Sequence, residues 1–137
     1  MEEPDGGQSF FLSAAEVIAL HAHIFGISDE QAADRLRSYS VLAGAVGRPR
    51  QHAHYGGADL ALQAAVLAHG IAEGQPFFDG NKRTALVALL TFLAINGTTT
   101  LASDGELAFQ IYNLAHGTTA APLADWLRPT LAARSPD

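Results

Sequence analysis

The stretch ALVALLTFLAI, residues 85–95, decides how the rest of the chain must fold. Only Thr91 interrupts its apolar side chains, and the run is far too short to span a bilayer. A helix that is apolar nearly all round has to be covered by other elements of the same domain. Asn96 and Gly97 follow it with residues typical of helix ends. We therefore expect Asn81 to begin a buried central helix around which the other helices pack.

Helix starts recur on both sides of this central segment. Three serines are each followed three residues later by Glu or Gln, which is the capping box of a helix N-terminus. An aspartate and a first-turn proline mark two more starts. The five predicted starts are at Ser13, Ser28, Asp59, Ser103 and Pro122. Together with the central helix they predict an all-α fold, a compact single-domain bundle.

Two segments do not fit a continuous helical pattern. A break is possible near Tyr39 within the second helical region, which is predicted to end near Gly47 and Pro49. Residues 48–57, RPRQHAHYGG, contain Pro and Gly and lack an apolar period, so we expect a loop, a flap or a short β-hairpin over a site. Residues 98–101 are the other short strand candidate.

Composition narrows the class of protein. The chain has 137 residues, no cysteine and a net charge of −6, which indicates one domain, no disulfide or thiolate site, and no general attraction to nucleic acid. No secretion signal or membrane span is predicted, so the cytoplasm is the default location. We expect a flexible lead-in at residues 1–9, a folded domain at residues 10–133 and a tail at residues 134–137.

The connection before the central helix, EGQPFFDGNKRTA (residues 73–85), has the chemistry of an anion site. A helix N-terminus carries partial positive charge and free N–H groups. Lys82 and Arg83 add two full charges there, Gly80 permits close approach of a ligand, and Asp79 suits Mg²⁺. Lys82 is the only lysine of the chain. The pattern favours a phosphoryl site, and the plainer alternative is a loop in which Asp79 or Asn81 caps the helix and the cations are solvated.

Residues 76–84, PFFDGNKRT, resemble the signature of the Fic/Doc family, His-Pro-Phe-x-Asp-Gly-Asn-Lys-Arg-Thr in its Doc branch. The resemblance implies a helical domain that transfers part of ATP to a hydroxyl of a target protein. It implies catalytic roles for the residue at position 75 and for Asp79, Lys82 and Arg83. The implied metal ligand is Asp79, which would hold Mg²⁺. The implied nucleotide-binding residues are Gly80, Asn81, Lys82 and Arg83, and Phe77 would anchor the loop.

The lysine at position 82 favours one branch of that family. Members that transfer AMP have glycine at this position, whereas the Doc branch has lysine. The resemblance therefore implies a toxin that phosphorylates a translation factor such as elongation factor Tu and is restrained by a Phd-like antitoxin. The self-inhibitory motif of many Fic proteins is absent, because His69 stands four positions before Glu73 where that motif has Ser or Thr.

Gln75 departs from the family motif, which begins with the histidine that takes the proton of the attacking hydroxyl. An amide can orient a hydroxyl but cannot accept its proton, so transfer should be weakened more than binding. Three explanations stay open: an engineered His-to-Gln change, a natural non-catalytic protein that binds nucleotide or a partner, or a substitute base. The candidates for that base are His52, His54 and His69.

Overall fold

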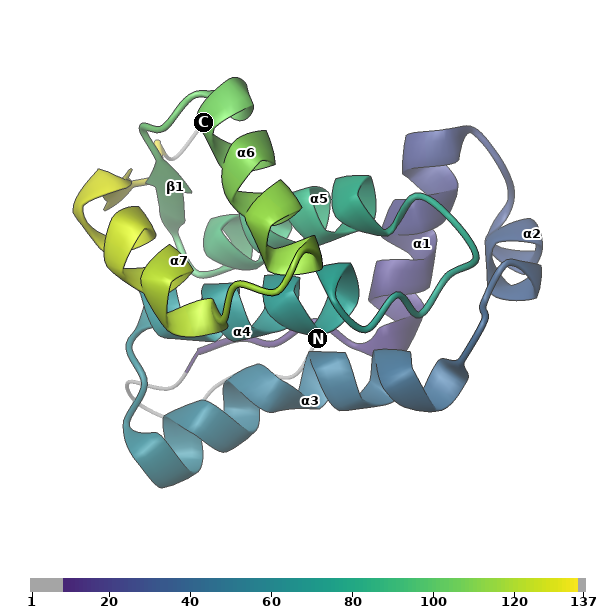
Figure 1. Ribbon diagram of the computed structural model, residues 1–137, viewed down its shortest axis with the longest axis horizontal. Helices are drawn as coiled ribbons and strands as arrows, with labels where there is room; N and C mark the ends of the chain where they lie inside the picture. Colours follow the sequence, from purple (N-terminus) through teal and green to yellow (C-terminus); the bar gives the residue numbers. More distant parts are fainter. Residues whose placement is uncertain (1–8, 136–137) are drawn as a thin grey trace.

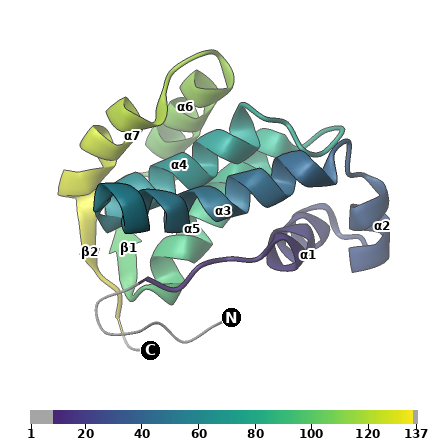
Figure 2. The ribbon, with the colours of Figure 1, turned by 90° about the horizontal axis from the view of Figure 1, so that it is seen from below.

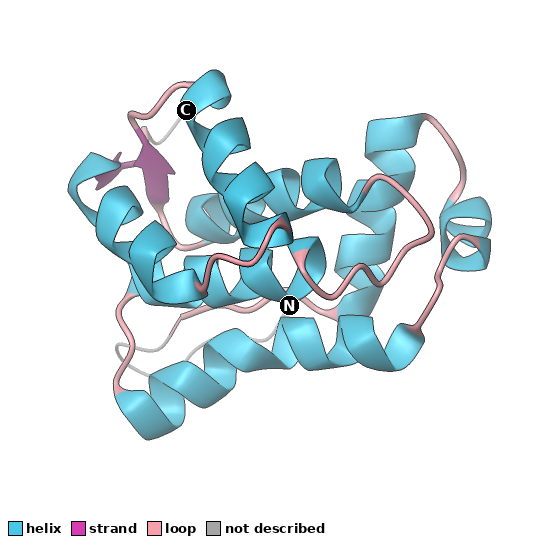
Figure 3. Ribbon diagram, in the orientation of Figure 1, coloured by secondary structure: helices cyan, strands magenta, loops and turns pink. Residues whose placement is uncertain are grey.

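The computed structural model describes residues 9–135, in which helices are the main regular structure (Figures 1 and 3). The helices are α1 (Ala14–Phe25), α2 (Asp29–Asp34), α3 (Tyr39–Gly56), α4 (Leu60–Ala72), α5 (Asn81–Ile95), α6 (Asp104–Ala115), α7 (Ala120–Leu127) and the 3₁₀ turn η1 (Arg128–Thr130). Two strands of three residues complete it, β1 (Thr98–Thr100) and β2 (Leu131–Ala133). The predicted all-α fold is confirmed. The predicted lead-in lies outside the described residues except for Ser9, and half of the predicted tail does as well.

Helices α4 and α5 lie side by side at the centre of the domain (Figures 1 and 2). Helix α4 also packs against α3, α6 and α7, and α5 packs against α1 and α6. Ten of the thirteen residues of α4 are buried, compared with seven of the fifteen in α5. The most enclosed helix is therefore α4 rather than the predicted α5, because its many alanines let neighbouring helices approach from several sides.

The predicted helix starts are confirmed, and side-chain caps explain those of α1, α2, α4 and α6. Ser13, Ser28 and Ser103 each accept a hydrogen bond from the backbone N–H three residues later, and the Glu or Gln at that position bonds back. Asp59 caps α4 through the N–H of Leu62 at 3.0 Å. These bonds satisfy N–H groups that the helices themselves leave free. These local caps therefore fix where α1, α2, α4 and α6 begin.

The predicted loop or flap at residues 48–57 is wrong, since α3 continues through Gly56. Pro49 lies inside the helix and is buried. The last part of α3 is mostly exposed, so it has no apolar stripe for a sequence pattern to detect. His52 and His54 therefore lie on an ordinary exposed helical turn rather than on a flap.

The short sheet forms elsewhere. Strand β1, which was predicted, pairs antiparallel with β2, which was not, with Thr98 opposite Ala133 and Thr100 opposite Leu131. The pairing brings the end of the described chain back beside the C-terminal end of α5 (Figure 2). A separate antiparallel bridge joins Leu36 to Phe77. This second pairing lies beside the connection between α4 and α5.

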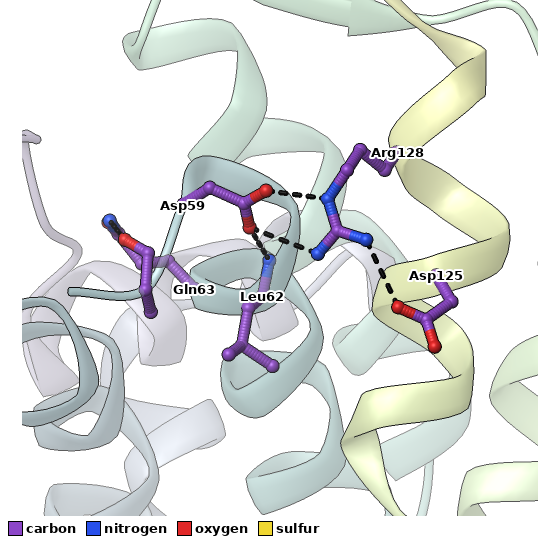
Figure 4. A network of polar contacts seen from close by, with 6 residues as sticks. Asp59, Leu62, Gln63, Asp125 and Arg128 are labelled. Carbon is purple, nitrogen blue, oxygen red and sulfur yellow. Dashed lines mark hydrogen bonds and ion pairs between the residues drawn. The ribbon is translucent and has the colours of Figure 1, made fainter. Parts of the chain in front are cut away.

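Ion pairs fasten the last helix to α4 (Figure 4). Arg128 donates to both carboxylate oxygens of Asp59, which still caps α4, and to Asp125 at 3.0 Å. The hydrogen bond from Arg128 holds the pKa of the Asp59 carboxyl below its usual value.

Within residues 9–135, no helix combines the length and the apolar character that crossing a membrane requires.

Candidate functional site

The family-like motif forms the connection from α4 to α5 and the first turn of α5. The side chains of Gln75, Asp79, Lys82 and Arg83 are all exposed there. Asn81 and Thr84, from the same stretch, are buried. The structure thus divides the motif into an outer set that can meet a ligand and an inner set that holds the connection in place.

Phe77 is the anchor of the connection, as predicted. It is 1% exposed, and its ring stacks on the imidazole of His21 with 3.8 Å between centroids and planes within 3°. Phe25 packs against the other ring of this pair, His21, at 4.7 Å. Helix α1 therefore supplies the surface on which the motif connection rests.

Asn81 binds the connection rather than capping α5. Its side-chain oxygen accepts a bond from the N–H of Phe77 at 3.0 Å, and its amide donates to the carbonyl of Phe77 at 2.9 Å. Both bonds are buried, where an unpaired amide group would cost free energy. Since α5 has Gly80 as its N-cap and no side-chain cap, the alternative in which Asn81 or Asp79 caps α5 is wrong.

Gly80 is the N-cap of α5, with φ +73° and no side-chain cap at this helix start. A Cβ atom at this position would lie 2.4 Å from Cζ of Phe25 and 3.2 Å from Cε1 of His21. Glycine is required here by the left-handed backbone and by the close packing on α1. The sequence led us to expect that a ligand approaches the backbone at Gly80 closely. On the side where a Cβ would lie, Phe25 makes that close approach instead.

A buried polar chain links α1 to this helix start. His21 is fully buried and its Nδ1 lies 2.8 Å from Oγ1 of Thr84, which in turn donates to the carbonyl of Gly80 at 2.9 Å. With the threonine proton donated to Gly80, the imidazole Nδ1–H is the donor to Thr84. Burial is the main cause that lowers the pKa of His21, the charge of Arg35 lowers it further, and Asp79 opposes both. The neutral imidazole is the form that fits this setting.

Residues 35–38, between α2 and α3, hold the other side of the connection. The guanidinium of Arg37 donates to the carbonyls of Gly74 at 2.7 Å and Gln75 at 2.8 Å. The backbone N–H of Arg37 donates to the carbonyl of Pro76 at 2.7 Å. Among residues 9–135, Gln75 is the only non-glycine residue with positive φ, at 52°. The backbone at the position of the family histidine is thus held in an uncommon conformation.

The charges of the outer set are available to a ligand. Within residues 9–135, Asp79, Lys82 and Arg83 take part in no ion pair with one another or with other groups, and the guanidinium of Arg83 lies 5.0 Å from the centre of the Phe25 ring. A stacked guanidinium keeps its N–H donors in one plane and free to bind oxygen.

In the described part of the chain, no cluster of three or more His, Cys, Asp or Glu side chains could hold a metal ion. Asp79 is the carboxylate of the motif connection and is exposed. One carboxylate is enough for Mg²⁺, which keeps waters and takes phosphate oxygens to complete its shell. Asp79 therefore fits such an ion where other oxygen ligands complete the shell.

The histidines considered as substitute bases lie on two helices, His52 and His54 on α3 and His69 on α4. His69 is half-buried in α4 and its Nδ1 lies 3.4 Å from the guanidinium of Arg48, while burial lowers its pKa. His54 lines a hollow of about 800 Å³ between the segment before α1, the end of α3 and the start of α4. A second hollow of about 550 Å³ lies between the start of α1 and α3. The motif residues line neither hollow.

The domain is small and helical, its connection from α4 to α5 is anchored on α1, and α5 begins without a side-chain cap. These features agree with the family found by comparison with known proteins. The Fic/DOC family model matches residues 11–93, more than half of the chain, and the chain belongs to that family. It is similar to the protein named Toxin Doc from Mycolicibacterium smegmatis, at 42% identity over 77 residues. That match covers 53% of this chain and 57% of the relative, so it spans little more than half of either protein.

Two residues that the sequence reading did not assign to the site, His21 and Arg37, support it directly. Each reaches the motif from a distant part of the chain, 63 residues from Thr84 and 38 residues from Gln75. A histidine in the apolar stripe of α1, beside Val17 and Leu20, was a usable signal for His21. No local pattern distinguishes Arg37 from a solvated surface arginine.

Proposed function

We propose that this chain is a Doc-type toxin that binds a nucleotide at the N-terminus of α5 and transfers its terminal phosphoryl group to a hydroxyl of a target protein. The observation that carries the proposal is the intact run from Pro76 to Thr84, placed so that Asp79, Lys82 and Arg83 are exposed at a helix start without a side-chain cap. Family membership and the similarity to a Doc toxin support the same reading. Gln75 is expected to weaken the transfer step.

Phosphate oxygens have several donors to use at this helix start. The first N–H groups of α5 have no intrahelical acceptor, and the aligned peptide dipoles leave about half a positive charge at the N-terminus. Lys82 supplies a point charge and Arg83 a planar fork that can bind two oxygens. Phosphoryl transfer depends largely on such positioning and charge stabilisation, so these groups would do most of the catalytic work.

Asp79 is the residue that would hold Mg²⁺ together with the nucleotide's own phosphate oxygens. The bound ion would neutralise charge that develops on the phosphate oxygens during transfer. The carboxylate has no cation paired to it in residues 9–135. It is therefore available for this role.

The transfer itself needs a proton acceptor. A target hydroxyl oxygen forms a bond to phosphorus, the bond to the nucleoside diphosphate breaks, and the hydroxyl proton must leave. Gln75 can accept a hydrogen bond from that hydroxyl through its amide oxygen but cannot keep the proton. Losing a general base typically lowers a rate by about 10²- to 10⁴-fold, while phosphate binding does not depend on it.

A non-catalytic nucleotide-binding protein is the second candidate function, and Gln75 is the observation that favours it. All groups of the proposed phosphate site are present, whereas the proton acceptor is the one replaced group.

Transfer of AMP is less favoured, because Lys82 places a long cation where the AMP-transferring members of the family have glycine. For the toxin, we propose a translation factor such as elongation factor Tu as the target and a Phd-like antitoxin as the restraint.

Restoring the base tests the proposed function. The Gln75→His variant, incubated with γ-labelled ATP, Mg²⁺ and a bacterial lysate, should label a protein of the translation machinery, and its expression should arrest growth unless an antitoxin is supplied. The Gln75→His/Arg83→Ala double variant is the matched control and should label nothing. If the folded Gln75→His protein labels no lysate protein, the toxin proposal fails. Saturable ATP binding by the same protein would then favour the second candidate.

A further inference from the structure

Arg37 binds three successive carbonyl groups of the motif connection. Its guanidinium donates to Gly74 and Gln75, at 2.7 and 2.8 Å, and its own N–H donates to Pro76 at 2.7 Å. The N–H of Ser38 shares the carbonyl of Pro76 at 3.0 Å. One residue from the segment between α2 and α3 thus holds the backbone on both sides of position 75.

These contacts fix the two peptide planes that flank residue 75. The carbonyl of Gly74 belongs to the plane before it, and the carbonyl of Gln75 belongs to the plane after it. The N–H of Gln75 also donates to Ile71 at 3.0 Å, so the first plane is held through both of its polar groups. When both planes are fixed, so are φ and ψ of residue 75 and the direction of its Cα–Cβ bond.

The conformation fixed in this way is one that glutamine rarely adopts by itself. Gln75 has φ 52°, in the left-handed region where L side chains crowd the backbone. Packing gives the preceding residue little freedom to relax, because a Cβ on Gly74 would lie 2.8 Å from Cγ1 of Val41. External contacts must therefore hold the uncommon φ, and Arg37 makes the side-chain contacts that do so.

Arg37 is exposed, and within residues 9–135 no carboxylate forms an ion pair with it. Its positive charge lies instead against carbonyls just beyond α4, where the helix dipole is negative. A planar guanidinium can bond two neighbouring carbonyls at once, and an ammonium group cannot reproduce that fork. The geometry, more than the charge, is therefore what Arg37 contributes.

We propose that Arg37 is a positioning residue, which sets the direction of the side chain at position 75 toward the hydroxyl that receives the phosphoryl group. The role of residue 75 in the transfer step rests on the proposed function. The effect of Arg37 on the backbone at position 75 can be tested separately. A simple cap at the end of α4 would explain a loss of stability without any change at position 75. The experiments below separate these two roles.

The structural test uses the absence of cysteine from the chain. A nitroxide attached to the single cysteine of the Gln75→Cys variant reports the order of the backbone at that position by electron paramagnetic resonance. Adding Arg37→Lys should narrow the centre line of the spectrum, because lysine keeps the charge but loses the fork. The control exchange is Arg134→Lys, beyond β2, which should leave the spectrum unchanged. An unchanged spectrum in folded Gln75→Cys/Arg37→Lys protein overturns the proposal.

The kinetic test uses the Gln75→His protein. Adding Arg37→Lys should lower kcat by up to about 100-fold through misplacement of the base, while KM for ATP stays within about twofold. Adding Arg134→Lys should change neither constant. An equal loss of kcat in both variants, or a rise in KM for ATP with kcat preserved, overturns the proposal. If the Gln75→His protein transfers nothing, the proposed function fails, and the spectroscopic test still decides the role of Arg37.

Discussion

Replacing Gly80 with alanine should destabilise the protein more than the same change at any open left-handed glycine. Gly80 has φ +73°, and an alanine held there costs about 1–2 kcal/mol for the left-handed backbone. Its Cβ would also meet two atoms of the Phe25 ring, at 2.4 and 2.6 Å. Forcing a methyl group into such a space typically costs a further 1–3 kcal/mol or so. The expected total loss is about 2–5 kcal/mol.

Gly97 is the matched control, because its φ is +70° and a Cβ there would meet nothing within 4 Å. Gly97→Ala should therefore show the backbone cost alone, about 1–2 kcal/mol. Urea unfolding followed by circular dichroism gives both free energies of unfolding. Combining Gly80→Ala with Phe25→Leu should recover part of the loss, with a coupling energy of about 1–3 kcal/mol. Equal losses at Gly80 and Gly97, with additive effects of Phe25→Leu, would refute this explanation of Gly80.

Three further perturbations test the supports of the site. Asn81→Ala removes both buried bonds to Phe77 and should lower the free energy of unfolding in urea by about 1–3 kcal/mol, and a loss indistinguishable from zero would contradict their role. Burial lowers the pKa of His21, so its contribution to stability is present above the unfolded pKa of about 6.5 and is lost as the pH falls below that value. The His21→Gln variant should therefore show a flatter dependence of the free energy of unfolding on pH than the parent protein. Asp59→Ala should lower the free energy of unfolding by about 1 kcal/mol, because it removes the cap that accepts the N–H of Leu62. Asp59→Asn should keep most of that free energy and lose only its dependence on salt concentration.

Much of the fold could be predicted because its helix starts are encoded locally. The boxes at Ser13, Ser28 and Ser103 each lie within four residues, and all three helices begin where those boxes place them. The prediction for residues 48–57 is wrong because Pro49 lies inside α3 and the turns that follow it are mostly exposed, so neither apolar period nor composition reveals a helix. Strand β2 was missed since its pairing with β1 joins residues more than 30 positions apart, for which three apolar residues give no signal.

The candidate site was predictable to a similar extent. The motif placed Asp79, Lys82 and Arg83 at the start of α5, and the structure has them exposed there. What the sequence could not reveal is which distant residues hold the connection. The stacking of His21 on Phe77 depends on how α1 packs in three dimensions, as do the bonds from Arg37. Such contacts follow from tertiary packing and leave no periodic trace in the chain.

The most direct test of the proposed nucleotide site is a titration of the isotope-labelled protein with ATP and Mg²⁺, followed by amide NMR. We expect saturable shifts centred on the N–H groups of Lys82 and Arg83, and loss of those shifts in Arg83→Ala but not in Arg134→Ala. The proposed site would be contradicted if those amides did not respond, or if the shifts were confined to the hollow between α3 and α4. Either result would mean that the start of α5 is not the nucleotide site.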